Sequence, residues 1–115
     1  MLYTSYFAKQ RNNKMNTLYA ITVNKPFWFK GNHLSIVAPT QDLLDRYKNG
    51  ITSEEDYIKE YIEMLNNNKE IILNAISRLP DESILLCYEG PNKFCHRHLL
   101  ANWLKENGYE IEEMK

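Results

Sequence analysis

The sequence predicts one small α/β domain over residues 1–115, with a three- to four-stranded, mostly parallel sheet flanked by about four helices. The first observation is the order of segments, in which short apolar stretches alternate with amphipathic ones. The second is that the stretches 18–23 and 84–89 are apolar on both sides, as strands covered on both faces are. The third is the length, because 115 residues suffice for one core of this kind and not for two.

The first half of the chain predicts two strands and a helix. Residues 2–8, rich in Tyr and Phe, predict the first strand, and residues 18–23 predict the second. Pro26 ends the second strand because proline cannot donate a ladder hydrogen bond. Thr40 is a good N-cap residue for a helix over residues 41–48, and the Asn49-Gly50 pair ends that helix.

The second half predicts three more helices and two strands. A helix begins at Thr52 or Ser53, since Thr52 and Glu55 have capping-box spacing. Its apolar side, which includes Tyr57 and Tyr61, has helical spacing and is assigned to packing. A third helix ends at Pro80. Residues 84–89 then predict a central strand, residues 95–107 a helix, and residues 109–112 a last strand.

Composition excludes several classes of protein. The formal charge of −1 argues against binding a nucleic-acid polymer by bulk electrostatics. No apolar run of about 18 residues exists, so we expect no membrane association. Two cysteines, Cys87 and Cys95, are too few for a disulfide scaffold and fit a reducing compartment. We therefore expect a cytoplasmic protein.

The charges are unevenly distributed along the chain. Residues 1–41 contain five Lys and Arg side chains and no Asp or Glu, and the remaining residues carry all 15 acidic side chains. One interpretation is two oppositely charged, solvated surfaces. The other is a cradle for an anion built from the N-terminal loops.

The segment from the predicted central strand to the next helix carries the residues suited to chemistry. Ligands of open α/β sheets bind outside the carboxyl ends of the strands, where Tyr88 and Glu89 lie. Cys95, His96 and Arg97 then open a helix, whose N-terminus attracts anions and lowers the pKa of a thiol. Cationic side chains conflict with the usual acidic preference at this position, and such conflicts are expected at functional sites.

The same segment carries a resemblance. The stretch Cys87-Tyr88-Glu89, followed by Cys95-His96-Arg97 and a leucine-rich helix, resembles the domain-of-unknown-function 488 family. Weaker similarity extends over Tyr3-Thr4-Ser5-Tyr6, Ala38-Pro39 and residues 47–51. The resemblance implies a compact α/β domain with its site at the Cys-His-Arg turn, and it implies no reaction. The chain departs from the family's more usual basic second strand, with Thr22-Val23-Asn24 in its place.

One interpretation of this turn is a catalytic site. Cys95 would be the nucleophile, with His96 beside it at the start of a helix. Adjacent residues on a helix point about 100° apart, so the base would have to be His98 or His33. Glu89 is a further candidate base. The alternative is a half-buried cysteine that packs at the entry to the helix.

A metal site is a second interpretation. Cys95 and His98 are three residues apart, and Cys87 arrives from the strand. A structural zinc site normally has four ligands in paired spacings, and no second pair exists in the sequence. His33 would have to be recruited from a distance. We therefore expect no metal and no cofactor.

The third interpretation, and the leading one, is a site for a phosphorylated, nucleotide-derived small molecule. Arg97 and the helix N-terminus would hold the anion, while aromatic side chains would stack on a base. Arg97 has an alternative role as a structural partner of Glu89, and the aromatic residues have an alternative role in packing. The predicted ligand-binding residues are Thr4, Ser5, Lys9, Arg11, Phe27, Trp28, Tyr88, Glu89, Asn92, Cys95, His96 and Arg97.

These interpretations give three hypotheses of function. The chain binds, and could sequester, a small anionic ligand; or it is an enzyme that uses Cys95, His96 or Glu89 on a similar substrate. The third hypothesis is a protein-interaction module that exposes Phe27-Trp28-Phe29. A homodimer is an expected partner arrangement, because one small chain encloses little of a large ligand.

Overall fold

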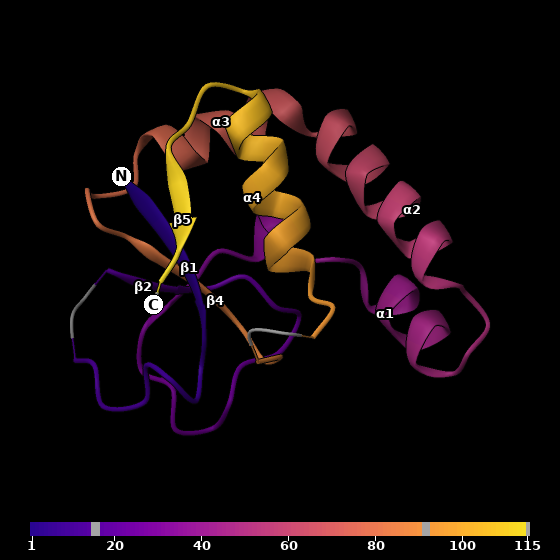
Figure 1. Ribbon diagram of the computed structural model, residues 1–115, viewed down its shortest axis with the longest axis horizontal. Coiled ribbons are helices and arrows are strands. Elements are labelled where there is room, and N and C mark those ends of the chain that lie inside the picture. The colour runs from indigo at the N-terminus through magenta and orange to yellow at the C-terminus, as the bar shows by residue number, and fades with distance from the viewer. Residues whose placement is uncertain (15–16, 91–92, 115) are drawn as a thin grey trace.

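The computed structural model describes residues 1–14, 17–90 and 93–114 (Figure 1). Its strands and helices follow the predicted order. They are β1 Leu2–Tyr6, β2 Leu18–Ala20, β3 Asn32–His33, a 3-10 turn Ser35–Val37, α1 Gln41–Lys48, α2 Glu54–Asn67, α3 Lys69–Ser77, β4 Ile84–Cys87, α4 His96–Glu106 and β5 Ile111–Glu113.

The sheet has five strands in the order β3-β2-β4-β1-β5, and all of its pairings are parallel. This confirms the predicted fold class, with one strand more than expected. The additional strand is β3, whose two residues are too few to produce a sequence pattern. All four residues of β4 are buried, which confirms its predicted central place.

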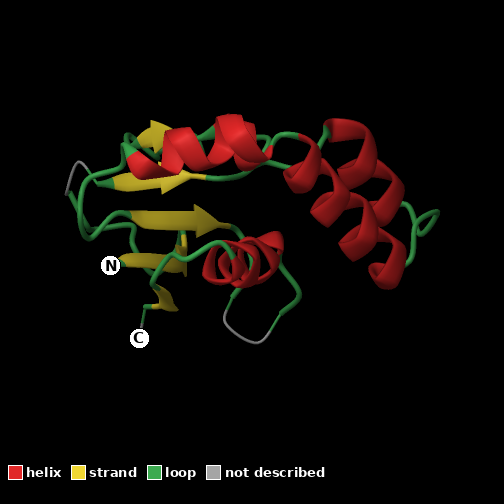
Figure 2. Cartoon of the chain, turned by 90° about the horizontal axis from the view of Figure 1, so that it is seen from above, coloured by secondary structure: helices red, strands yellow, loops and turns green. Residues whose placement is uncertain are grey.

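Helices cover one face of the sheet and loops cover the other (Figures 1 and 2). Leu85 and Cys87 of β4 face the helices, in a core that includes side chains from α1, α2, α3 and α4. Leu86 faces the N-terminal loops, where it lies in a second cluster with Phe7 and Phe29. Alternate side chains of β4 therefore enter different cores, which explains why the segment is apolar throughout.

The helix starts are fixed by side-chain caps. Thr40 Oγ1 accepts a hydrogen bond from the Leu43 amide at 3.1 Å, as predicted for α1. At the start of α2 it is Ser53 Oγ that accepts from the Asp56 amide. The alternative start at Thr52 was wrong, because the Thr52 hydroxyl accepts from Arg46 Nη1 instead.

Helices α1 and α2 extend past the carboxyl ends of the strands (Figure 2). Arg46 of α1 and Glu60 of α2 form an ion pair at 2.6 Å, and Tyr61 donates a buried hydrogen bond to the Val37 carbonyl. This helix pair is thereby held beside the turn that follows β4. Among the described residues, no helix is both long and apolar enough to cross a membrane.

Candidate functional site

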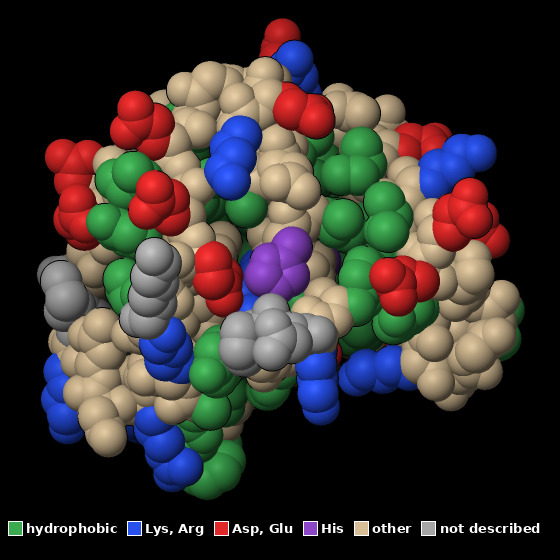
Figure 3. All heavy atoms as spheres, viewed as in Figure 1, with side chains coloured by type: hydrophobic (Ala, Val, Ile, Leu, Met, Phe, Trp, Pro, Cys, Tyr) green, Lys and Arg blue, Asp and Glu red, His purple; other side chains and the backbone are tan. Residues whose placement is uncertain are grey.

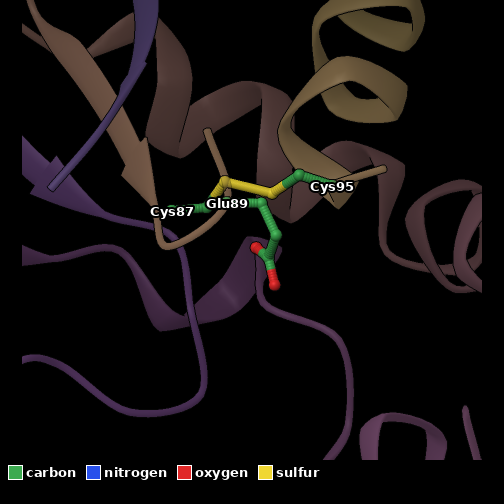
Figure 4. Close-up of side chains that lie close together, drawn as sticks. All are labelled: Cys87, Glu89 and Cys95. Atoms are coloured by element: carbon green, nitrogen blue, oxygen red, sulfur yellow. A yellow bond between two sulfur atoms is a disulfide. The ribbon is translucent and has the colours of Figure 1, made fainter. Parts of the chain in front are cut away.

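The turn between β4 and α4 brings the two cysteines together. Cys87 is the last residue of β4, and Cys95 is the N-cap residue of α4 with extended backbone (φ −151°). Their sulfur atoms form a disulfide (Figure 4). We expected two separate thiols, because the sequence does not reveal that the strand end and the helix entry direct both side chains into the same core.

Arg97 is completely buried, and all five of its N–H donors have partners. Nε and Nη2 donate to the Glu113 carboxylate at 3.1 and 2.9 Å. Nη1 donates to Cys87 Sγ at 2.8 Å and to the Glu89 carbonyl, and Nη2 also donates to the Gly90 carbonyl. The side chain thus holds the β4–α4 turn to β5 and has no donor left for a ligand. The predicted anion contact of Arg97 is replaced by an internal one.

The acceptor of this network is Glu113, on edge strand β5. Burial acts to raise the pKa of its carboxyl, but the hydrogen bonds from Arg97 and Thr4 bring it below the usual value. Thr4 Oγ1 is therefore occupied with Glu113, at 2.5 Å. Ser5 is also buried and accepts from Gln10 Nε2. Both hydroxyls are therefore buried and hydrogen-bonded within the domain, and neither residue lines the cavity beside Cys95 and His96 described below.

His96 is buried and has a defined tautomer. Nε2 lies 2.6 Å from the Ile21 carbonyl, and a carbonyl can only accept, so Nε2 carries the proton. Burial, together with the charge of Arg97, lowers the pKa of His96 to about 4, so the ring is neutral at pH 7. Nδ1 then presents its lone pair to Cys95 Sγ, 3.8 Å away.

The prediction that His96 would point away from Cys95 was wrong. It applied the helical angle between neighbours, but Cys95 precedes the first helical residue and has extended backbone. The alternative base His33 is bonded through Nε2 to the Thr22 carbonyl at 2.6 Å. Of these two histidines, it is therefore His96 that lies beside Cys95.

A cavity of about 330 Å³, the turn cavity, lies beside Cys95 and His96. Tyr47, Tyr57 and Phe94 form one aromatic wall, with ring centroids 5.0–5.6 Å apart. Burial and the neighbouring Glu89 raise the pKa of Tyr57, which keeps its hydroxyl protonated. The described lining residues are Thr22, Val23, Asn24, Pro39, Leu44, Tyr47, Lys48, Tyr57, Tyr88, Glu89, Phe94, Cys95 and His96.

Four predicted site residues therefore meet at this cavity: Tyr88, Glu89, Cys95 and His96. Lys48 and Asn24 also line the cavity without having been predicted, and Tyr57, expected only to pack, lies in its wall. Asn24 follows β2 and could have been found from the rule that ligands bind beyond the carboxyl ends of parallel strands. Lys48 comes from α1, and no local signal places the end of α1 beside the β4–α4 turn.

Other predicted residues lie at a second cavity of about 470 Å³, the loop cavity, between the N-terminal loops. The Arg11 guanidinium lies 4.9 Å from the ring centroid of Trp28, and both line this cavity. Lys9 instead donates to the Met114 carbonyl. Phe27 is 95% exposed and lines neither cavity. Asn92 lies outside the described residues.

The charge asymmetry of the sequence is also spatial. Most Lys and Arg side chains on the face shown in Figure 3 lie in its lower half, over the N-terminal loops, and most Asp and Glu side chains lie in the upper half. The described lining of the loop cavity includes Arg11, Lys14 and Lys30 and no acidic residue. The turn cavity instead combines Lys48 with Glu89.

Fold and site together define a class: a small parallel α/β domain whose central strand and following helix place Cys-x-Glu and Cys-His-Arg stretches beside a cavity. A family model described as "DUF488-N3a: Active DUF488-N3 subclade" matches residues 27–108. The chain belongs to the DUF488 family, which confirms the resemblance. No curated protein matches it, and neither does a solved structure.

Proposed function

We propose that the chain binds a phosphorylated, nucleotide-derived small molecule in the turn cavity. The observation that supports this most directly is the combination of aromatic side chains, one lysine and one carboxylate around about 330 Å³ at the carboxyl end of the central strand. Ligand pockets are typically mostly apolar cavities of roughly 300–1,000 Å³ with a few polar groups that fix orientation.

Each polar group has a role in this proposal. Tyr88 is 48% exposed and offers a ring face on which a base stacks. The exposed carboxylate of Glu89 accepts hydrogen bonds from ribose hydroxyls or base N–H groups. The exposed ammonium of Lys48 attracts the phosphate. Arg97 acts indirectly, as a positioning residue that fixes the backbone of Glu89 and Gly90.

A second candidate function is an enzyme that uses the same site. The observation that favours it is the Nδ1 lone pair of His96, which is directed at Cys95 Sγ. In the reduced protein this nitrogen would accept a hydrogen bond from the Cys95 thiol and hold the sulfur at the wall of the cavity. Glu89 offers an alternative base.

Calorimetric titration with nucleoside mono-, di- and triphosphates and with dinucleotides tests the binding proposal. We expect Tyr88→Ala to weaken binding roughly fivefold or more, because base stacking contributes about 1–3 kcal/mol. Trp28→Ala, in the loop cavity, is the matched control and should change affinity less than about twofold, since its ring lies outside the proposed site. Loss of binding in the Trp28 variant alone would move the ligand to the loop cavity and contradict the proposal.

Native mass spectrometry of the purified protein separates binding from turnover. A ligand that is released intact after denaturation supports sequestration, and its mass identifies the compound. With an added nucleotide, a binder returns the compound unchanged and tolerates Cys95→Ser. An enzyme converts the compound, and a thiol enzyme loses that conversion in Cys95→Ser while still binding.

A further inference from the structure

We propose that the reduced chain binds a zinc-class divalent ion through Cys87, Cys95 and His96, with Glu89 as a fourth ligand facing the turn cavity. This proposal does not require a nucleotide to bind, although the metal site shares Glu89, Cys95 and His96 with the turn cavity. It also revises the expectation of no metal, which rested on the lack of a second closely spaced pair of ligands in the sequence.

Three of the four ligand atoms already lie together, and the fourth lies beside Cys95. The sulfur atoms of Cys87 and Cys95 and a carboxylate oxygen of Glu89 are all within 4.8 Å of one another. In Figure 4 the Glu89 carboxylate lies below the two sulfur atoms. His96 Nδ1 is 3.8 Å from Cys95 Sγ. Sulfur and nitrogen ligands of a tetrahedral zinc ion stand about 3.5 Å apart, so this spacing fits a shared ion.

The surroundings of His96 are those of a metal ligand. A ligating imidazole normally donates its other ring N–H to a carboxylate or a backbone carbonyl, which fixes the tautomer and the ring orientation. His96 does this through Nε2 and the Ile21 carbonyl, at 2.6 Å. The ring is also held by Tyr61, whose ring centroid lies 5.6 Å away. The lone pair on Nδ1 is thereby held toward Cys95 Sγ.

The backbone spacing of the cysteines suits an ion between them. Their Cα atoms are 7.3 Å apart. Disulfide-linked residues usually have Cα atoms about 4.4–6.8 Å apart. The two sulfurs on one zinc ion are about 3.8 Å apart, which is farther than in a disulfide, so the two Cα atoms can also lie farther apart. Breaking the disulfide with a dithiol or phosphine reductant gives two thiols and the oxidised reductant. Both sulfurs then separate onto an ion without closing the backbone further.

The charges and the ligand chemistry agree with this assignment. Two thiolates and a carboxylate carry three negative charges, and the ion carries two positive charges. The Arg97 guanidinium, whose Nη1 lies 2.8 Å from Cys87 Sγ, offsets the remaining negative charge. Binding releases the two thiol protons to solvent. Thiolate and imidazole ligands select zinc-class ions over Mg²⁺ and Ca²⁺. Glu89 is the exposed ligand, so its position is the one that a water molecule or a substrate oxygen can share.

Cobalt(II) titration of the reduced, chelator-treated chain under anaerobic conditions tests the site without any nucleotide. We expect one equivalent to produce a thiolate-to-cobalt charge-transfer band and the d–d bands of tetrahedral coordination, and Zn²⁺ to abolish both. Zinc should also protect both cysteines from a thiol reagent until a chelator is added. A titration without the charge-transfer band overturns the proposal.

Four samples make the result specific. Cys87 is fully buried and its replacement risks the fold, so Glu89→Gln is the main variant, and we expect it to weaken cobalt affinity roughly tenfold or more. Glu106→Gln, exposed at the far end of α4, is the matched control and should leave affinity unchanged. The unreduced disulfide form should lose the charge-transfer band, and Cys95→Ser, which keeps only the Cys87 thiolate, should weaken both the band and the cobalt affinity. Equal binding by wild type and Cys95→Ser overturns the proposal as an adventitious surface site.

Discussion

The turn cavity and the loop cavity use arginine in opposite ways. At the turn, Arg97 is buried and directs every donor to Glu113, Cys87 and two carbonyls. Between the N-terminal loops, Arg11 lies over Trp28 and lines an open cavity. An arginine in a motif is thus no evidence of an anion contact by itself. Its acceptors decide whether it supports the site or touches the ligand.

The largest difference should appear in stability. We expect Arg97→Ala to lower the free energy of unfolding by about 3 kcal/mol or more, because it removes the cationic partner of the Glu113 carboxylate and the hydrogen bonds that Arg97 donates to the Glu89 and Gly90 carbonyls. Arg11→Ala should lower it by about 0.5–1 kcal/mol, the size of an exposed cation–π contact. Urea denaturation of both variants measures the difference. Equal losses would show that the buried network does not distinguish the two regions.

A smaller effect concerns pH. Unfolded His96 takes up a proton below pH of about 6.5, whereas folded His96 stays neutral down to about 4. The unfolded chain therefore binds more protons in this window, and the free energy of unfolding falls as the pH drops through it. His96→Gln, which keeps a donor for the Ile21 carbonyl, should reduce this dependence in urea denaturation over the same window. A smaller slope should remain from His98, because burial and Arg97 lower its pKa as well.

The loops around the loop cavity provide the control for this titration. Residues 7–14 and 17–31 contain no Asp, Glu or His, so they have no side chain that titrates in this range. Arg11→Ala should leave the pH dependence unchanged. The assignment of this pH dependence to His96 would be contradicted if the free energy of unfolding of His96→Gln changed with pH as steeply as that of the wild type, while Arg11→Ala altered the dependence.

The smallest effect is expected at Phe27. Its side chain is 95% exposed, so Phe27→Ser should change the free energy of unfolding by less than about 0.5 kcal/mol. Thermal denaturation checks this, and sedimentation velocity reports the association state of the same samples. A loss above about 1 kcal/mol, together with a smaller sedimenting species, would show that a second copy covers Phe27 in solution.

The sequence predicted those elements of the fold whose signals are local. The cap at Thr40 and the stop at Asn49-Gly50 predicted the bounds of α1, and the apolar run identified β4 as the centre of the sheet. β2 ends at Ala20 and is therefore shorter than the predicted strand over residues 18–23. The Ile21 amide still donates to the Leu86 carbonyl of β4, and the chain then bends away from the sheet. β3 has no local signal of its own.

The location of the site could be predicted from the sequence, but the roles of several of its residues could not. The carboxyl end of β4 and the start of α4 identified Tyr88, Glu89, Cys95 and His96. The inward direction of Arg97 was not predictable, because its carboxylate partner lies 16 residues later on another strand. The Cys95–His96 pair was missed for a conformational reason, since the N-cap backbone departs from helical geometry.

Edge strand β5 has a consequence for the motion of the site. Edge strands, which are paired on one side only, open more readily in local fluctuations than central strands, and among the described strands β5 pairs with β1 alone. When β5 opens, Glu113 leaves Arg97, and a buried guanidinium loses its counter-charge. Fraying of this edge is therefore coupled in energy to the β4–α4 turn, and amide hydrogens in β5 and at the start of α4 should exchange through one shared opening event.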